Sequence, residues 1–407
     1  MLYLRALFIL AFWLILNSSL WAADTFFSAY LKVRGEYNDN VTFTYYNPEE
    51  DFLSITSPSL FFNYKSERFS WYSRAGLDIY DYMDLDRLDT VNQHYEIKTD
   101  YQWRDRWRFS GQAYVIKDTT LESELQETGI VRFREDRRRY YFSLGVTHLL
   151  TELTQLNFNF VKSRTEYDWQ YNVDYDYSSA SLSFQRRLRN RRDVLMSRFY
   201  YTNIDSDTSK VDNYGFLLGW QRFLSETSGF TAFAGVRYTS VDYFLYYRRL
   251  VVDPRFWPPF RVILEKRKQT DEEWSYLADI SFHKKGERST YRLGLNNDLS
   301  YSSFGEAVDR TRIYGRFSYK LRPRWSFLFS AGYYLTSSKG RVYEEDNIFY
   351  YLRPSLKYLL TERWSLELAY SYSDYRDKVR DHEYDRHQIW MVLTFEFGKP
   401  PALGFAP

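Results

Sequence analysis

The sequence contains no cysteine and, beyond its first residues, no long apolar run. Without cysteine, disulfide frameworks, thiolate metal sites, cysteine nucleophiles and a lipid-modified cysteine are all excluded. After the N-terminal segment no stretch reaches eighteen uncharged apolar residues, so no transmembrane helix is expected. A net charge of +2 also lacks the basic excess of a nucleic-acid-binding domain, and no nucleic-acid partner is expected.

Aromatic side chains are what the sequence has in excess. They make up 21% of the chain and include 40 tyrosines, although 27% of the residues are charged and the mean hydropathy is −0.56. Tyrosine suits places where one end of the side chain is apolar and the other is wet. Membrane interfaces are such places, and transmembrane β-barrels carry aromatic girdles there.

The first residues have the pattern of a secretory signal peptide. Arg5 precedes an apolar run of eleven residues, Ala6 to Leu16, and the small residues Ala22 and Ala23 follow it. The run is too short for a membrane-spanning helix, which needs about 20 residues. The sequence therefore predicts three parts: a cleaved signal peptide over 1–23, an outer-membrane β-barrel over 24–398 and a short periplasmic tail over 399–407.

Apolar and polar side chains alternate along most of the chain after residue 27. The clearest examples are Trp325–Thr336, Trp364–Ser373 and Ile389–Phe397, where aromatic or aliphatic side chains occupy every second position. A period of two is the signature of a β-strand, and the segment lengths match the about 9–11 residues that a tilted strand needs to cross the hydrocarbon. Short polar turns alternate with longer links, which predicts an all-β, antiparallel up-and-down transmembrane barrel of about 18 strands with both termini in the periplasm.

The segment 242–273 interrupts this rhythm. It contains Pro254, Pro258 and Pro259 together with many aromatic and basic residues. It is expected to be a long connection, either an ordinary exposed loop or a loop that folds over or into the pore.

If the aromatic face of each strand touches lipid, the other face lines the interior. Charges on that face require water or partners, because Arg or Lys facing lipid near the midplane would cost about 2–4 kcal/mol. The bases that the alternation assigns inward, and that we predict to line the pore, are Lys32, Arg34, Arg74, Lys98, Arg198, Arg237, Arg292, Arg312, Arg316, Lys320, Arg353 and Lys357. The inward acids are fewer, namely Glu36, Asp78, Glu96, Asp100, Asp279, Asp298, Glu367 and Glu396.

This face points to transport. A barrel of about 18 strands is too wide to be filled by side chains, so an aqueous channel is expected. Rings of Arg and Lys inside a pore favour anions. The alternative is that bases and acids pair across neighbouring strands and stiffen the wall, and both can hold together.

Catalysis has little support in the sequence. The five histidines are scattered, and none has the spacing of a metal site, so no metal or cofactor is expected. Neighbouring strands could still bring a serine and a histidine together, because a triad is defined by geometry. His283, beside Ser281 on the inward face, is the candidate for such an enzyme of the lipase or deacylase type.

Several motifs resemble a known family. YNDNVTFT (37–44) followed by DFLSITSPSL (51–60) is similar to the opening of the type-two β-barrel porin family. EDRRRYYFSLGVTHLLTELTQLNF (135–158) resembles that family's charged entry, strand, LTE turn and return strand, and it is echoed at 223–238 and 359–372. The chain departs from the usual barrel ending, because GKPPALGFAP follows Phe397. The resemblance implies an outer-membrane barrel encoded with exopolysaccharide or capsule export systems.

Three functions follow, in order of preference. The first is a passive outer-membrane pore for export of an exopolysaccharide or capsular polysaccharide. The second is a general or anion-preferring diffusion porin for small solutes, and the third is the barrel enzyme. The expected partners are outer-membrane lipid and lipopolysaccharide, the barrel assembly machinery and, for the first function, a periplasmic polysaccharide-export protein and its polysaccharide.

Overall fold

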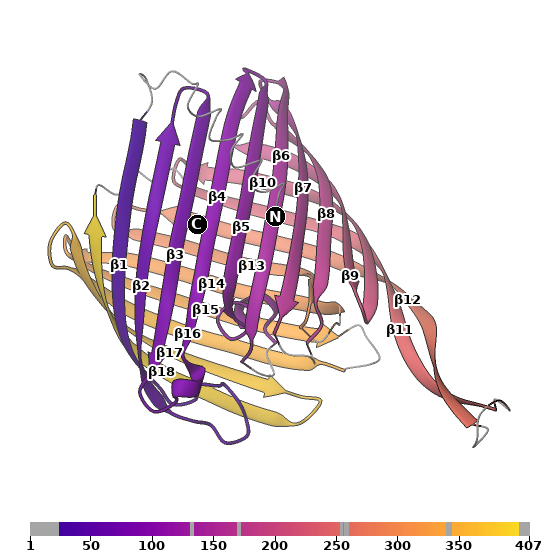
Figure 1. Cartoon of the computed structure of the whole chain (residues 1–407). Helices are drawn as coiled ribbons and strands as arrows, with labels where there is room; N and C mark the ends of the chain where they lie inside the picture. Colours follow the sequence, from indigo (N-terminus) through magenta and orange to yellow (C-terminus); the bar gives the residue numbers. More distant parts are fainter. Residues whose placement is uncertain are drawn as a thin grey trace.

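A computed structural model describes residues 24–130, 134–168, 172–252, 255, 260–303, 305, 307–338 and 344–398. The predicted signal peptide, 1–23, and the predicted tail, 399–407, lie outside the described residues. Almost all of the described chain is β-strand, and the strands form one sheet (Figure 1). None of the helices in this part of the chain is long and apolar enough to span a membrane.

The sheet has 18 strands, in agreement with the sequence prediction. They are β1 (Asp24–Asn38), β2 (Asp51–Lys65), β3 (Phe69–Tyr82), β4 (Thr90–Arg104), β5 (Trp107–Thr119), β6 (Asp136–Thr151), β7 (Thr154–Tyr167), β8 (Tyr175–Arg187), β9 (Asp193–Ser206), β10 (Ser209–Ser225), β11 (Ser228–Val252), β12 (Phe260–Lys285), β13 (Ser289–Tyr301), β14 (Ala307–Arg322), β15 (Trp325–Ser338), β16 (Asp346–Leu359), β17 (Trp364–Asp377) and β18 (His382–Phe397). Two short helices interrupt the connections, η2 (Asp86–Leu88) and α2 (Glu124–Thr128).

Each strand pairs antiparallel with its neighbours in sequence, and the last strand pairs with the first. β1 and β18 are in register from Ala29 opposite Phe397 to Asn38 opposite Gln388. This pairing closes the sheet into a barrel, so neither β1 nor β18 leaves an open edge along the wall. Closure is required in a membrane, where no water is present to hydrogen-bond an exposed strand edge.

Alternation sorts side chains between the two faces as the sequence predicted. On β1, Phe27 and Val33 are 61% and 44% exposed on the outer face, whereas Ser28 and Glu36 on the inner face are buried. On β15, the aromatic face runs from Trp325 through every second residue, as expected from the sequence. The outer surface is therefore apolar and fits a lipid environment.

The short turns that the sequence predicts all lie at one end of the barrel, which we call the turn end. They join β2 to β3, β4 to β5 and so on to β16 and β17. Most of the longer connections lie at the opposite, loop end. In outer-membrane barrels the short turns face the periplasm.

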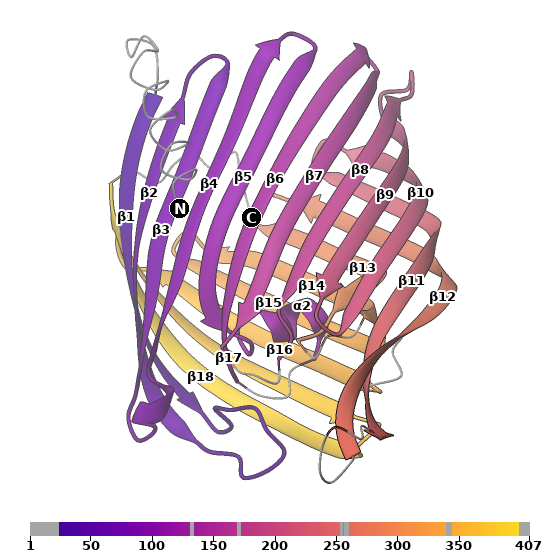
Figure 2. The ribbon, with the colours of Figure 1, turned by 45° about the vertical axis from the view of Figure 1, so that its right-hand side comes forward.

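The segment 242–273 is not a long loop, and that expectation was wrong. Most of it continues β11 and β12, which pair from Ser228 opposite Lys284 to Val252 opposite Phe260. β12 pairs with β13 only from Ala278 onward, so the end of the β11–β12 hairpin leaves the wall. Figures 1 and 2 show it projecting beyond the barrel and not into the lumen. β11 and β12 continue past the point where the alternating pattern weakens, because strand formation depends on structural context as well as on local sequence.

Two adjacent residues of β7 test the assignment of faces. Phe158 is 45% exposed on the outer face, and Asn159 lies beside it on the inner face, opposite Gly145. We expect Phe158→Arg to reduce the free energy of unfolding in lipid vesicles by about 2–4 kcal/mol, because an arginine would face hydrocarbon. Asn159→Arg, the matched control, should reduce the free energy of unfolding far less. Urea titrations followed by tryptophan fluorescence measure both, and equal losses would contradict the assignment.

Candidate functional site

The strand register places all twelve predicted pore-lining bases on the same face of the sheet. The inner face can be followed from strand to strand through directly opposed residues, for example from Arg292 on β13 to Arg316 on β14, then through Ser330 on β15 to Arg353 on β16. The other nine follow the same parity on β1, β3, β4, β9, β11, β14 and β16. Their role in lining a solute path remains a prediction.

The bases are unevenly distributed around the barrel. The inner faces of β13 to β16, which we call the basic wall, carry Arg292, Arg310, Arg312, Arg316, Lys320, Arg353 and Lys357. Asp298 is the one inward acid that the described residues provide there, and both of its carboxylate oxygens bind Arg310, at 3.1 and 2.8 Å. For the other six bases, no carboxylate of the described chain lies within ion-pairing distance. The wall therefore keeps a positive charge that faces the interior.

On the opposite side of the barrel, the inward charges of β4 and β5 are paired. Lys98 lies 2.8 Å from Glu96, and Arg108 lies 2.9 Å from Asp100. His94 of β4 lies 2.8 Å from Asp78 of β3. Both predicted arrangements therefore occur. Arg108–Asp100 and His94–Asp78 join neighbouring strands, Lys98–Glu96 lies within β4, and the inward bases of β13–β16 other than Arg310 are unpaired within the described chain. The resulting transverse field attracts anions towards one wall.

Near the join between β1 and β18, arginines stack on an inward tryptophan. The guanidinium of Arg34 lies 4.1 Å from the centre of the Trp390 ring, and that of Arg353 lies 5.5 Å from it. Arg34 also forms an ion pair with Glu36. These contacts fix Arg34 and Arg353 against the wall.

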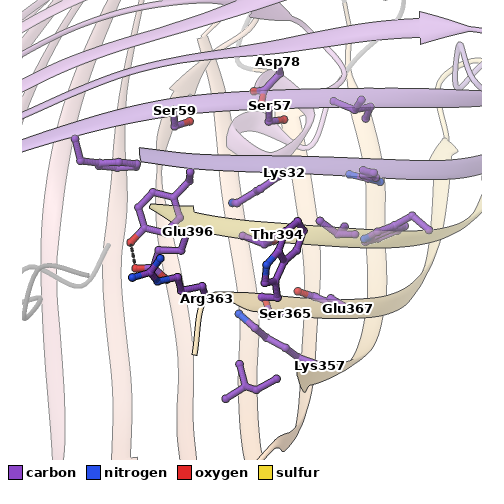
Figure 3. A pocket seen from close by; sticks show the side chains of 18 of the residues that line it. Lys32, Ser57, Ser59, Asp78, Lys357, Arg363, Ser365, Glu367, Thr394 and Glu396 are labelled. Carbon is purple, nitrogen blue, oxygen red and sulfur yellow. Dashed lines mark hydrogen bonds between the residues drawn. The ribbon is translucent and has the colours of Figure 1, made fainter. Parts of the chain in front are cut away.

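Beside this cluster, a recess of about 610 Å³ opens in the inner wall at the turn end. It lies between β1–β3 and β16–β18, and Lys32, Arg34, Arg74 and Lys357 are among its lining residues (Figure 3). The structure thus brings together four of the twelve predicted bases in one cavity. The remaining eight lie elsewhere on the inner face.

The connection between β5 and β6 folds into the barrel, which the sequence analysis missed. Leu121 and Leu125 pack with Tyr334 of β15, Phe349 of β16 and Tyr375 of β17. Since β6 and β15 lie half-way round the ring from each other, residues 120–130 cross the lumen, and we call them the crossing segment. Figure 2 shows its helix α2 inside the ring of strands, near the loop end. A loop folding into the pore, which was one of two alternatives for 242–273, is therefore supplied by a different connection.

Buried polar contacts anchor the crossing segment on both sides. The Tyr334 hydroxyl donates to the carbonyl of Gln126 at 2.9 Å, and the Thr336 hydroxyl donates to the carbonyl of Thr128 at 2.8 Å. Gly129 ends the helix with φ of +76°, and a Cβ atom there would lie 2.9 Å from Cβ of Tyr334. Both the conformation and the close approach to β15 therefore favour glycine.

Two carboxylates of the crossing segment bind the near wall and a second connection. Glu124, only 2% exposed, accepts hydrogen bonds from the Tyr167 hydroxyl at 3.1 Å and from the Ser303 backbone N–H at 2.9 Å. Glu127 binds Arg137 at 3.2 Å and Arg139 at 2.6 and 2.5 Å. Arg137 and Arg139 are inward bases that the sequence analysis did not assign.

The end of the β13–β14 hairpin also bends inward. Tyr301 and Ala307 pack against Val211 of β10 and Val241 of β11, which lie on the inner face. As a result Asp309 reaches the predicted pore-lining Arg237 and forms an ion pair with it. Arg237 is 1% exposed and already paired with Asp309. It therefore stabilises the inward bend of the β13–β14 hairpin and is not available to a solute.

His283 and Ser281 do not form a catalytic pair. Both lie on the inner face of β12, but within the described chain no hydrogen bond joins them, and His283 packs over Gly229. Among these same residues no group of His, Asp and Glu is arranged to hold a metal ion. The enzyme hypothesis thus has no assembled site in the described part of the barrel.

Comparison with solved structures finds outer-membrane channels of low sequence identity. OpdK of Pseudomonas aeruginosa, solved with vanillate, is 10% identical, with a TM-score of 0.45 over 92% of this chain and 99% of that one. The channel DcaP of Acinetobacter baumannii is 11% identical, with a TM-score of 0.43 over 93% and 99%. No protein-family model and no curated protein matches the chain. The resemblance to the type-two porin family therefore rests on the sequence motifs alone.

The closed 18-stranded ring with its apolar outer face decides the location. This chain is an outer-membrane β-barrel. Its outer face meets lipid, and its inner face carries the basic wall, the recess at the turn end and the crossing segment at the loop end.

The packing of Leu125 tests whether the crossing segment restricts the lumen. Leu125 is 2% exposed, and Leu125→Ala should weaken the docking of the segment by about 2–5 kcal/mol. We expect a larger single-channel conductance in planar bilayers. Leu150→Ala, at a residue 43% exposed at the turn end, is the control and should leave conductance unchanged. Unchanged conductance in both variants would show that the segment does not restrict the lumen.

Two glutamates make the docking of the crossing segment depend on pH. Burial raises the pKa of Glu122 from 4.5 to about 7. Burial also acts to raise the pKa of Glu127, but Arg139 and Arg137 outweigh it and lower that pKa to about 2. Docking therefore loses stability as Glu122 ionises between pH 4.5 and 7, and loses the contribution of Glu127 as pH falls from 4.5 towards 2.

We therefore expect the segment to be held most firmly near pH 4.5 and to loosen towards pH 8. Glu122→Gln should reduce the loosening at high pH, since the amide does not ionise; the part that remains comes from Glu124, whose pKa is also raised by burial. Hydrogen–deuterium exchange of amides 120–130, corrected for intrinsic rates, measures the effect. Glu152→Gln, in an exposed turn, is the control. The same pH dependence in Glu122→Gln and in the unsubstituted protein would contradict this assignment.

Proposed function

We propose that this protein is a passive outer-membrane channel through which small anionic solutes diffuse along the basic wall. The observation that carries the proposal is the set of six unpaired inward bases on β13–β16, namely Arg292, Arg312, Arg316, Lys320, Arg353 and Lys357. Arginine and lysine lining a wet lumen lower the electrostatic barrier for anions and raise it for cations. The channel needs no chemistry and no cofactor for this role.

The two ends of the barrel contribute differently. At the loop end the crossing segment occupies part of the lumen, which favours small solutes over large ones. At the turn end the inner wall is hollowed by the recess. A solute would pass the segment and then meet the basic wall, moving down its concentration gradient.

Export of an exopolysaccharide or capsular polysaccharide is the second candidate. Inward tyrosines favour it, because aromatic rings can stack on sugar rings: Tyr114 and Tyr141 stack at 4.4 Å beside a cavity of about 240 Å³ that Tyr175 and Tyr177 also line. A polymer would require the crossing segment to move aside. Flux of an acidic polysaccharide through the unsubstituted barrel in vesicles would support export, and flux of small anions alone would support the diffusion channel.

Charge removal on the basic wall tests the diffusion channel. Arg292 and Arg316 are opposite each other in the register of β13 and β14. We expect the double variant Arg292→Gln/Arg316→Gln to lower the anion-to-cation permeability ratio, measured as the reversal potential across a KCl gradient at about 0.1 M. The effect should shrink at about 1 M, where the Debye length falls from about 10 to 3 Å.

Arg138→Gln is the matched control for this experiment. Arg138 lies on the outer-face register of β6 near the loop end and forms an ion pair with Asp168 at 3.3 Å. Its replacement should leave the permeability ratio unchanged. A barrel that shows no anion preference before substitution, or a double variant with the original ratio, would reject the proposed function.

A further inference from the structure

The recess at the turn end differs from the rest of the inner wall in chemistry as well as in shape. Basic, hydroxyl and apolar side chains converge there from six strands. Lys32 interacts electrostatically with the bases Arg74 and Lys357 and with the acids Asp78 and Glu367, although these residues come from β1, β3, β16 and β17. Figure 3 shows Lys32 and Lys357 directed into the same space. Closure of the barrel between β1 and β18 is what brings these strands together.

These three bases are not neutralised by ion pairs. For Lys32, Arg74 and Lys357, the described chain provides no carboxylate within 4.0 Å. Arg34 is the fourth base of the recess that lies on a strand. By contrast, it is paired with Glu36 and stacked on Trp390. Three positive charges thus face a wet cavity without an ion-pair partner, and Arg74 lies 5.5 Å from the centre of the Phe61 ring.

Most acids that line the recess are engaged or lie apart from these bases. Asp78 binds His94 at 2.8 Å, and Glu396 accepts a hydrogen bond from Tyr30 at 2.8 Å, which Figure 3 draws. Glu367 lies opposite Lys357 in the strand register, outside ion-pairing distance. The Glu367 carboxylate could therefore accept a hydrogen bond from a hydroxyl or ammonium group of a ligand.

Hydroxyl groups complete the polar lining. Ser57 and Ser59 of β2, Ser365 of β17 and Thr394 of β18 surround the same space as the bases (Figure 3). Hydroxyl donors together with Lys and Arg are the groups that bind tetrahedral oxyanions, because they supply several hydrogen bonds and neutralise more than one negative charge. Three cations are better matched by a phosphate, which carries about −1.5 to −2 at pH 7, than by a single carboxylate.

The volume of the recess sets the size of the ligand. About 610 Å³ lies within the about 300–1,000 Å³ typical of sites for small organic molecules. A phosphate group would occupy only part of it. Ile55, Phe61 and Leu359 provide an apolar lining for an attached organic group.

We propose that the recess is a binding site for a small organic phosphate, with Lys32, Arg74 and Lys357 holding the phosphate group. This proposal rests on the proposed anion channel. It names the class of solute that the channel would retain at its turn end. Bound there, the solute would be held at the periplasmic mouth between the lumen and the bulk periplasm.

Block of the single-channel current by three matched probes tests the site. The probes are glycerol 3-phosphate, lactate and glycerol, added to the full-length barrel in planar bilayers. We expect glycerol 3-phosphate to bind with the lowest apparent Kd, lactate more weakly, and glycerol not detectably. Lactate binding as tightly as glycerol 3-phosphate would overturn the assignment to phosphate.

Charge-removing variants locate the binding. Lys32→Gln/Arg74→Gln should raise the apparent Kd for glycerol 3-phosphate by about tenfold or more, since loss of about 1.4 kcal/mol changes Kd tenfold. Lys357→Gln should act in the same direction and keeps the test valid if the double variant fails to fold. Arg138→Gln removes the same charge from the outer-face register of β6, outside the recess, and should leave Kd near its original value.

The outcomes separate the two proposals. A barrel without anion preference would reject the proposed function and this site together. An anion-selective barrel in which the recess variants bind glycerol 3-phosphate as tightly as Arg138→Gln does would reject the site and leave the channel standing.

Discussion

Closure of the sheet is the constraint on which the rest of the structure depends. In hydrocarbon an unpaired backbone group costs several kcal/mol, so the wall can have no open edge. The pairing of β1 with β18 removes that edge. It also joins the two ends of the chain, so that Lys32 near the start and Lys357 near the end line one recess. The chemistry of that cavity exists only because the ring is closed.

The second determinant is the period of two, which separates lipid-facing from water-facing side chains. It carries the aromatic residues outward and the charges inward on successive strands. Whether an inward base is then neutralised depends on the inward residues next to it, on its own strand and on the strands beside it. Lys98 has Glu96 beside it, whereas Arg292 has Arg316 directly opposite. The unequal distribution of acids around the ring therefore creates the positive side of the lumen.

These two determinants explain what could be predicted from the sequence. Strand number, turn positions and the faces of the twelve bases assigned inward follow from local alternation and turn composition. The register agrees with them even at Leu328 and Tyr334, where the pattern of β15 is broken. Tyr334 was a signal that something apolar covers the inner face at that point. Its partner, Leu125, lies in a connection without periodicity and far away in sequence, so local pattern could not identify it.

The same limit explains two further differences. Arg237 looked like a pore-lining base, but its ion pair with Asp309 depends on the inward bend of the β13–β14 end, which is a tertiary effect. The segment 242–273 looked like a loop because of its prolines and its weak alternation. Extended β11 and β12 stabilise each other by backbone pairing, which depends little on side-chain pattern.

The projecting β11–β12 hairpin has a consequence for self-association. Within the described residues, β12 pairs only with β11 before Ala278, so one side of the strand presents unpaired backbone groups. Such an edge can recruit a strand from another molecule. Lys268, 58% exposed and bound to Asp242, and the exposed pair Arg249 and Glu265 place charges along this ribbon. A second strand that paired with this edge would have to remove water from these charges, which costs free energy. The extension can therefore be exposed to water without promoting aggregation.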